Sequence, residues 1–152
     1  MTTLTAPSLL HKKSSFFNGA ECLGIHRGAI DTTTVTTKPP PVVMASVRKV
    51  LLELGLQVQE ESTYNYRCIR LARRPESDES GSINLEKAGS NTFVYGPHTE
   101  DPGDEVRLSV ELTRLEGLND TYSLDIRRLK GNLRSYKFLY ETIRDKTAIS
   151  TK

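Results

Sequence analysis

The sequence predicts an α+β fold, in which an antiparallel sheet of about four strands carries two helices on one face. Three observations lead to this fold class. Apolar residues recur at helical spacing from Val43 to Leu54. The segments 106–115 and 122–129 alternate between apolar and polar residues, which predicts strands with one wet face. A second helical pattern follows Asn132, so the predicted order is helix, two strands, loop, two strands, helix.

The first helix is predicted from apolar residues that share one of its faces: Val43, Val47, Val50, Leu51 and Leu54. Pro41 suits the first turn and Gly55 suits the stop. The next two segments, LQVQ (56–59) and YNYRCIRLA (64–72), alternate in polarity and predict a hairpin with its turn near residues 61–63.

The second pair of strands is joined by the turn GLND. Its inward-facing residues are expected to be Val106, Leu108, Val110, Leu112, Tyr122, Leu124 and Ile126. The outward-facing residues of its first strand are expected to be Arg107, Ser109, Glu111 and Thr113. The last helix begins at the cap residue Asn132, after Gly131, and presents Leu133, Tyr136, Leu139, Tyr140 and Ile143 on one face.

Composition divides the chain into a domain and its flanking segments. Residues 1–41 are rich in Thr, Ser, Gly and Pro and are predicted to be a flexible tail or linker. Residues 42–148 form the domain, with a disordered acidic insertion at about 74–104 (PESDESGS, GPHTEDPGD). Residues 149–152 are a tail.

The totals fit one domain with one modest core, since the chain has 152 residues of which 36% are hydrophobic. A net charge of +2 is too small for a general polyanion binder, so an electrostatic function requires clustered cations. Cys22 and Cys68 lack metal or redox spacing and are expected to be free thiols in a reducing cytoplasm. No apolar run is long enough to span a membrane, and the N-terminal sequence is not typical of a signal peptide.

No enzymatic motif is visible, whether a phosphate-binding loop, a nucleophile elbow or a zinc-binding helix. The histidines all fall in segments that are expected to be disordered: His11, His26 and His98. The carboxylate pairs Glu60/Glu61 and Asp101/Asp104 fall in turns or in the insertion. The sequence therefore predicts no catalytic residues, no metal site and no cofactor in this chain.

A nucleic-acid partner is not expected either. The tyrosines beside the arginines could stack on bases, but most fall on predicted inward faces: Tyr64, Tyr66, Tyr122, Tyr136 and Tyr140. Glu111 and Asp125 would also interrupt a nucleic-acid site on the wet face of the sheet.

The remaining feature is a set of cations on two elements. Arg48 and Lys49 lie on the first helix, and Arg127, Arg128 and Lys130 lie where the last strand runs into the last helix. If the helices lie side by side, these groups could converge into one patch facing anionic headgroups, with each cation contributing about 1 kcal/mol. Ordinary surface charge is the alternative explanation.

Two stretches of the chain resemble a known family. KPPPVVMASVRKVLLELGLQVQEES with YNYRCIR, and VRLSVELTRLEGLNDTYSLDIRRLKGNLRSYKFLYETI, resemble the kinase-associated 1 domain. This domain lies at the C-terminus of Ser/Thr kinases related to the AMP-activated kinase, and the microtubule-affinity-regulating kinases with their fungal relatives are the nearest comparison. The likeness runs from Pro39 to Thr147 without the insertion.

The resemblance implies a regulatory role. It implies that Arg48, Lys49, Arg127 and Arg128 occupy positions like the basic residues of the family that contact phospholipid. It further implies binding to acidic phospholipids at the plasma membrane, a cytoplasmic protein, and autoinhibition of its own kinase domain, which alone would use ATP and Mg²⁺. The acidic insertion and Asp125 depart from the family pattern. A protein-interaction module in a kinase subunit assembly, without lipid binding, is the competing interpretation.

Overall fold

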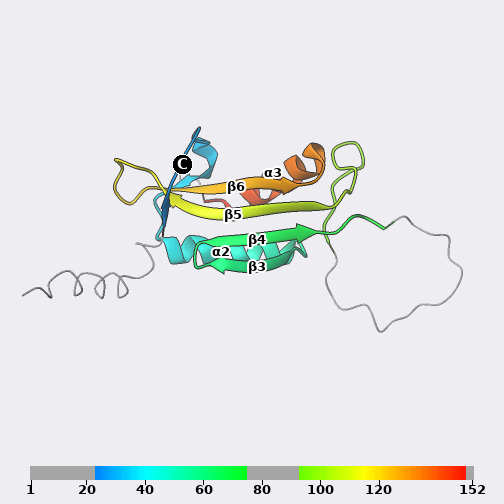
Figure 1. The fold of residues 1–152 in the computed structure, drawn as a ribbon, viewed down its shortest axis with the longest axis horizontal. Helices are drawn as coiled ribbons and strands as arrows, with labels where there is room; N and C mark the ends of the chain where they lie inside the picture. Colours follow the sequence, from blue (N-terminus) through cyan, green and yellow to red (C-terminus); the bar gives the residue numbers. More distant parts are fainter. Residues whose placement is uncertain (1–22, 75–92, 150–152) are drawn as a thin grey trace, which may run out of the picture.

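In the part of the chain that the structure describes, the fold is a single sheet with two helices on one face, as the sequence predicts (Figure 1). A computed structural model describes residues 23–74 and 93–149. The helices are α2 (Pro40–Glu53) and α3 (Leu133–Thr147). The main strands are β3 (Gln57–Ser62), β4 (Asn65–Arg70), β5 (Val106–Arg114) and β6 (Tyr122–Lys130).

Within the described residues the sheet has six strands rather than the expected four: five follow the order β2-β6-β5-β4-β3, and β1 lies off this path. The additional strands are β1 (Gly24–Ile25), which pairs in parallel with β5, and β2 (Val35–Thr36), which pairs antiparallel with β6. β1 pairs with Thr113 and Arg114 of β5. The pairing of β4 with β5 ends just before these residues, at Glu111. The α+β class is therefore confirmed with two more strands.

The helices bury the predicted apolar face of the sheet. Buried residues of the sheet include Cys68, Val106, Leu108, Val110, Leu112, Leu124 and Ile126. Buried residues of the helices include Val43, Val47, Val50, Leu51, Leu139 and Ile143. Figure 1 shows α2 behind β3 and β4, and α3 behind β6. The opposite face of β4, β5 and β6 is not covered by either helix, and we call it the open face.

Local signals set the ends of these elements where the sequence indicated. α2 begins at Pro40 within a run of prolines, and Gly55 follows it with a φ of 75°. The β3–β4 register closes at Ser62 opposite Asn65, so the hairpin turn lies about one residue later than expected.

The start of α3 depends on Gly131 and Asn132. Gly131 has a φ of 114°, and a Cβ there would lie 2.3 Å from the carbonyl oxygen of Glu105, so only glycine fits. The Asn132 side chain accepts hydrogen bonds from the backbone N–H groups of Arg134 at 2.8 Å and Ser135 at 3.4 Å. This is the predicted N-cap.

The prediction of a flexible tail over residues 1–41 is wrong for residues 23–36. Residues 23–36, which we call the strap, contribute β1, β2 and the short 3-10 helix η2 (Thr32–Thr34) to the sheet edge. Strands of two residues carry no periodic pattern, so the polar composition of the strap suggested a linker. His26, expected in a disordered segment, is bonded to Asp125 of β6 at 2.8 Å.

The predicted insertion is wrong for its second part. Residues 93–104, which we call the anchored loop, pack against the end of β4 through a buried ion pair between Asp101 and Arg70. His98 lies in this loop and its Nε2 is 2.6 Å from Nη1 of Arg73. Ile149, expected in the C-terminal tail, is buried. Predictions for residues 1–22, 75–92 and 150–152, including His11 and Cys22, lie outside the described residues.

None of the helices among the described residues is both long and apolar enough to cross a bilayer.

Candidate functional site

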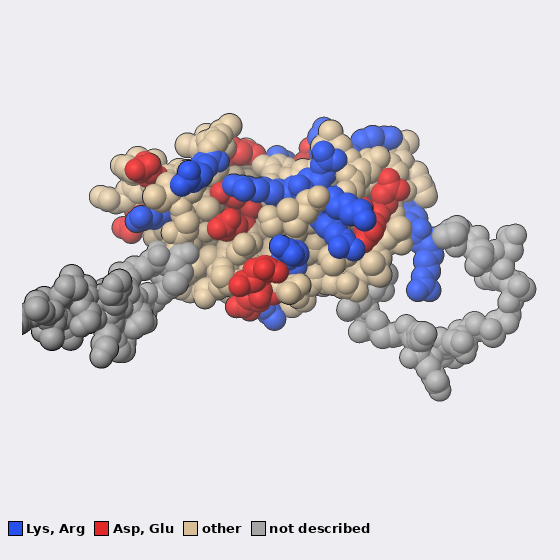
Figure 2. All heavy atoms as spheres, viewed as in Figure 1, with Lys and Arg blue, Asp and Glu red and all other residues tan. Residues whose placement is uncertain are grey.

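Cations from three strands meet on the open face. Arg67 of β4 pairs with Ser109 of β5, and Ser109 pairs with Arg127 of β6, so the two arginines flank a small residue in one cross-strand row. In the next row, Arg107 of β5 pairs with Lys130 of β6. We call Arg67, Arg107, Arg127 and Lys130 the open-face cluster. Figure 2 shows Lys and Arg side chains gathered across this face, with some Asp and Glu beside them.

Lys130 reaches this face because of a β-bulge. Arg107 pairs with Lys130, but its neighbour Leu108 pairs with Arg128, so Leu129 is an extra residue in β6. Without the bulge, strict alternation would place Lys130 on the covered face, like Leu124 and Ile126.

Two cations of the cluster are partly neutralised and two are not. Glu105 lies 3.1 Å from Arg107, and Glu61 lies 3.7 Å from Arg67. Among residues 23–74 and 93–149, no carboxylate lies within 4.0 Å of Arg127 or Lys130. The available positive charge is therefore greatest along β6.

Asp125 lies on the same face but does not expose a free carboxylate. It accepts hydrogen bonds from His26 Nδ1 at 2.8 Å, Thr113 Oγ1 at 2.7 Å and Ser123 Oγ at 2.8 Å. The strap covers it, and it is buried. Its negative charge is thus countered locally, although the sequence suggested that it would oppose an anionic ligand on the wet face.

His26 is a structural contact rather than a free base. Its Nδ1 lies 2.8 Å from a carboxylate oxygen of Asp125 and its Nε2 lies 2.9 Å from the carbonyl oxygen of Ala29, and both of these oxygens are acceptors. Only the doubly protonated ring can donate to both. Burial lowers the pKa of His26, but the hydrogen bonds to Asp125 and Ala29 outweigh burial, so its pKa is raised.

The structure does not bring the predicted lipid-binding residues together. Arg48 and Lys49 are exposed on α2, where Arg48 Nη1 lies 3.5 Å from Glu60 Oε2 of β3. In the sheet order, β5 and β4 separate β6 from β3. Arg128 turns away from the open face, and its Nη1 donates to the carbonyl oxygen of Gly131 at 2.8 Å. Of the predicted residues, only Arg127 and Lys130 join the open-face cluster.

Sequence analysis missed Arg67 and Arg107 as members of this surface. Their outward direction was predictable from alternation, but the register that aligns them with Arg127 and Lys130 was not. Whether any of these cations binds lipid remains a prediction.

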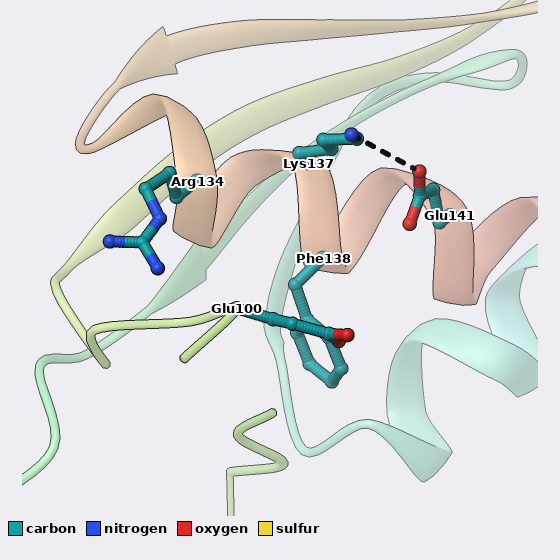
Figure 3. Close-up of a pocket in the computed structure, with 5 residues that line it drawn as sticks. All are labelled: Glu100, Arg134, Lys137, Phe138 and Glu141. Carbon is teal, nitrogen blue, oxygen red and sulfur yellow. Dashed lines mark ion pairs between the residues drawn. The ribbon is translucent and has the colours of Figure 1, made fainter. Parts of the chain in front are cut away.

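A hollow lies between the anchored loop and α3 (Figure 3). It has a volume of about 230 Å³ and is lined by Glu100, Arg134, Lys137, Phe138 and Glu141. Lys137 and Glu141 are 3.9 Å apart, so the wall carries both signs of charge. Arg134 also donates to the carbonyl oxygen of Thr99. This hollow has neither a strong net charge nor a nucleophile with a partner base.

Cys68, the free cysteine of the described residues, is buried in the core. Burial raises the pKa of its thiol to about 12, so the thiolate that nucleophilic chemistry requires is not formed near neutral pH.

The comparison with family models agrees with the resemblance in the sequence. Residues 104–148 match the family model described as Kinase associated domain 1. Among solved structures, the chain is similar to the adenylate sensor from AMP-activated protein kinase in complex with 5-aminoimidazole-4-carboxamide 1-beta-D-ribofuranotide. That similarity has 12% sequence identity and a TM-score of 0.42, and covers 82% of this chain and 100% of the other. No curated protein matches the chain.

Proposed function

We propose that this chain is a regulatory, non-catalytic module of the kinase associated domain 1 type, the family model that residues 104–148 match, and that it binds acidic phospholipid membranes. The observation that carries the proposal is the open-face cluster, where cations of three neighbouring strands share one surface. Each cation near an anionic bilayer contributes about 1 kcal/mol. Four together would give a weak, salt-dependent contact, suited to reversible recruitment of a parent Ser/Thr kinase to the cytoplasmic side of the plasma membrane.

We place the centre of the lipid contact on the open face of the sheet rather than on α2. Arg127 and Lys130 are its main residues because no ion pair with another described residue reduces their charge, and Arg67 and Arg107 support them. Arg48 and Lys49 lie on the α2 side, so they add to the net charge without facing the same surface. Restraint of the kinase domain of the parent protein is a further part of the proposal, and the sequence resemblance supports it. ATP and Mg²⁺ would be bound by that kinase domain and not by this chain.

The test compares two variants that lose the same charge at different places. Arg127→Ala/Lys130→Ala should weaken binding to phosphatidylserine vesicles by about 2 kcal/mol, or roughly thirtyfold, at low salt. Arg48→Ala/Lys49→Ala should weaken it much less. Vesicle sedimentation with and without phosphatidylserine measures both, and thermal unfolding followed by circular dichroism confirms that each variant folds.

Three results would contradict the proposal. Equal binding of the wild-type chain to neutral and acidic vesicles would exclude an electrostatic contact. No binding to acidic vesicles at low salt would exclude lipid binding and favour the protein-interaction alternative. Equal losses in the two double variants would show that net charge, rather than the open-face cluster, controls binding.

A further inference from the structure

The junction between β6 and α3 exposes two leucines to solvent. Leu129 is 50% exposed and Leu133 is 60% exposed. Both belong to the connection at which β6 ends and α3 begins, at the right-hand end of the molecule in Figure 1. Large apolar side chains that remain this exposed in one short connection are candidates for contact with an apolar partner.

The backbone itself holds these leucines out of the core. Leu129 is the extra residue of the β-bulge, so it has no residue opposite it on β5. Leu133 is the first residue of α3, directly after the Asn132 cap, while the core-facing side of the helix carries Leu139 and Ile143. Neither leucine packs into the hydrophobic core.

The charges along this connection have one sign. The stretch from Arg127 to Lys137 contains no Asp or Glu, and its cations are Arg127, Arg128, Lys130, Arg134 and Lys137. Glu105 approaches Gly131 through its backbone, but its carboxylate is paired with Arg107. Lys137 is paired with Glu141, at 3.9 Å. Exposed leucines among cations have the chemistry of a protein segment that lies at the interface of an anionic bilayer.

We propose that Leu129 and Leu133 insert into the boundary between headgroups and acyl chains of an anionic bilayer, while the neighbouring cations contact the lipid phosphates. This inference rests on the proposed function, because the open-face cluster brings the junction to the membrane. Cations alone act at a distance and are screened by salt, whereas leucines contribute only after they leave water. Insertion therefore adds a salt-resistant component to binding.

The structure provides a matched control for this inference. Leu118, in the turn between β5 and β6, is 57% exposed, and that turn lies at the opposite, left-hand end of β5 and β6 in Figure 1. Its sequence neighbours include the acidic residues Glu116 and Asp120 instead of cations. Leu118→Ala removes as many carbons as either leucine change of the test variant does alone, from a similarly exposed site at the other end of the two strands.

The experiment measures insertion separately from binding. The full chain is added beneath a phosphatidylserine-containing lipid monolayer, and the rise in surface pressure is recorded; vesicle sedimentation is repeated at low and high salt. The wild-type chain and Leu118→Ala should raise the pressure and keep part of their binding at high salt. Leu129→Ala/Leu133→Ala should lose the pressure rise and bind about tenfold more weakly for each leucine.

Failure of this inference is distinct from failure of the proposed function. If the wild-type chain binds acidic vesicles without a pressure rise and is fully released by salt, insertion is wrong and lipid binding stands. If it does not bind acidic vesicles at low salt, both are wrong. If the chain is a dimer in solution and Leu129→Ala/Leu133→Ala makes it a monomer, the leucines cover a second copy and the inference is overturned.

Discussion

The strap and the anchored loop are two polar segments that join the same sheet by different ion pairs. The strap is held by His26 to Asp125 of β6, and the anchored loop is held by Asp101 to Arg70 of β4. In both cases a charged contact adds to the backbone hydrogen bonds that hold a segment with little apolar surface of its own. The comparison shows that an ionic contact can define a domain boundary that composition alone does not reveal.

The two contacts differ in burial and in their dependence on protonation. Arg70 and Asp101 both have side chains that are 0% exposed, and the guanidinium binds both carboxylate oxygens, at 2.6 and 2.9 Å. Asp101 also accepts from the backbone N–H groups of Gly96 and Gly103. His26, by contrast, holds its charge only while its ring is doubly protonated. The ion pair of the loop is thus retained at any ordinary pH, whereas the contact of His26 with Asp125 depends on pH.

The largest effect is expected when Arg70 is removed. Arg70→Met leaves the Asp101 carboxylate buried without its partner, which should lower the free energy of unfolding by about 3–5 kcal/mol. Arg107→Met, which breaks the exposed pair with Glu105, is the control and should cost about 1 kcal/mol or less. Urea unfolding followed by circular dichroism measures both. A cost for Arg70→Met no larger than that of the control would show that the loop is held by other contacts.

The pH dependence of the Arg70–Asp101 contact follows from Asp101. Burial alone raises the pKa of this carboxyl, but the hydrogen bonds from Arg70 and the backbone outweigh it, so its pKa lies well below the ordinary 3.8. Its contribution to stability is therefore present above that ordinary value. It is lost only as the pH falls through the lower value of the folded protein.

A smaller, pH-dependent effect is expected at His26. The folded protein raises the pKa of His26 above its ordinary 6.5, so the stability it provides is complete below that pH and is lost as the pH rises through the folded value. His26→Gln should cost about 1.5–3 kcal/mol in mildly acidic solution, the value of a hydrogen bond to a charged group, and less in mildly alkaline solution. Urea unfolding of both proteins at the two pH values measures this difference. A cost that does not change with pH would show that the ring is not charged when it binds Asp125.

Sequence patterns predicted the elements in which apolar residues recur at a regular spacing. Alternation identified Val106 to Leu112 as a buried strand face, and Asn132 was recognised as a helix cap because its neighbours are close in sequence. The strap could not be predicted, since strands of two residues have no period and its partner Asp125 is far along the chain.

One long-range contact did leave a signal in the sequence. Arg70 has the same direction on β4 as the buried residues Tyr66 and Cys68, so alternation places a cation in the core. A buried guanidinium requires a carboxylate, and the acidic residues nearest in the sequence to the following strand include Asp101 and Asp104. The open-face cluster is different, because only the strand register shows that Arg67 and Arg127 share a row.

The smallest expected difference lies between two matched variants, at one glycine in each segment. Gly28 of the strap and Gly103 of the anchored loop have φ values of 96° and 84°, so alanine is strained at either position. At Gly28 a Cβ would meet nothing within 4 Å, whereas at Gly103 it would lie 2.9 Å from the Arg73 Cβ, beside the N–H that donates to Asp101. Gly28→Ala should therefore cost only the backbone strain, about 1–2 kcal/mol.

Gly103→Ala should cost the same strain and about 1 kcal/mol more, because a tightly packed side chain must move. Urea unfolding of the two variants measures the difference. Because the φ angles at the two glycines are similar, alanine should cause similar backbone strain at both sites. Equal losses of unfolding free energy in the two variants would mean that the anchored loop adjusts to the added methyl group as easily as the strap does. The contrast between a fixed and a conditional attachment would then rest on the titration of His26 alone.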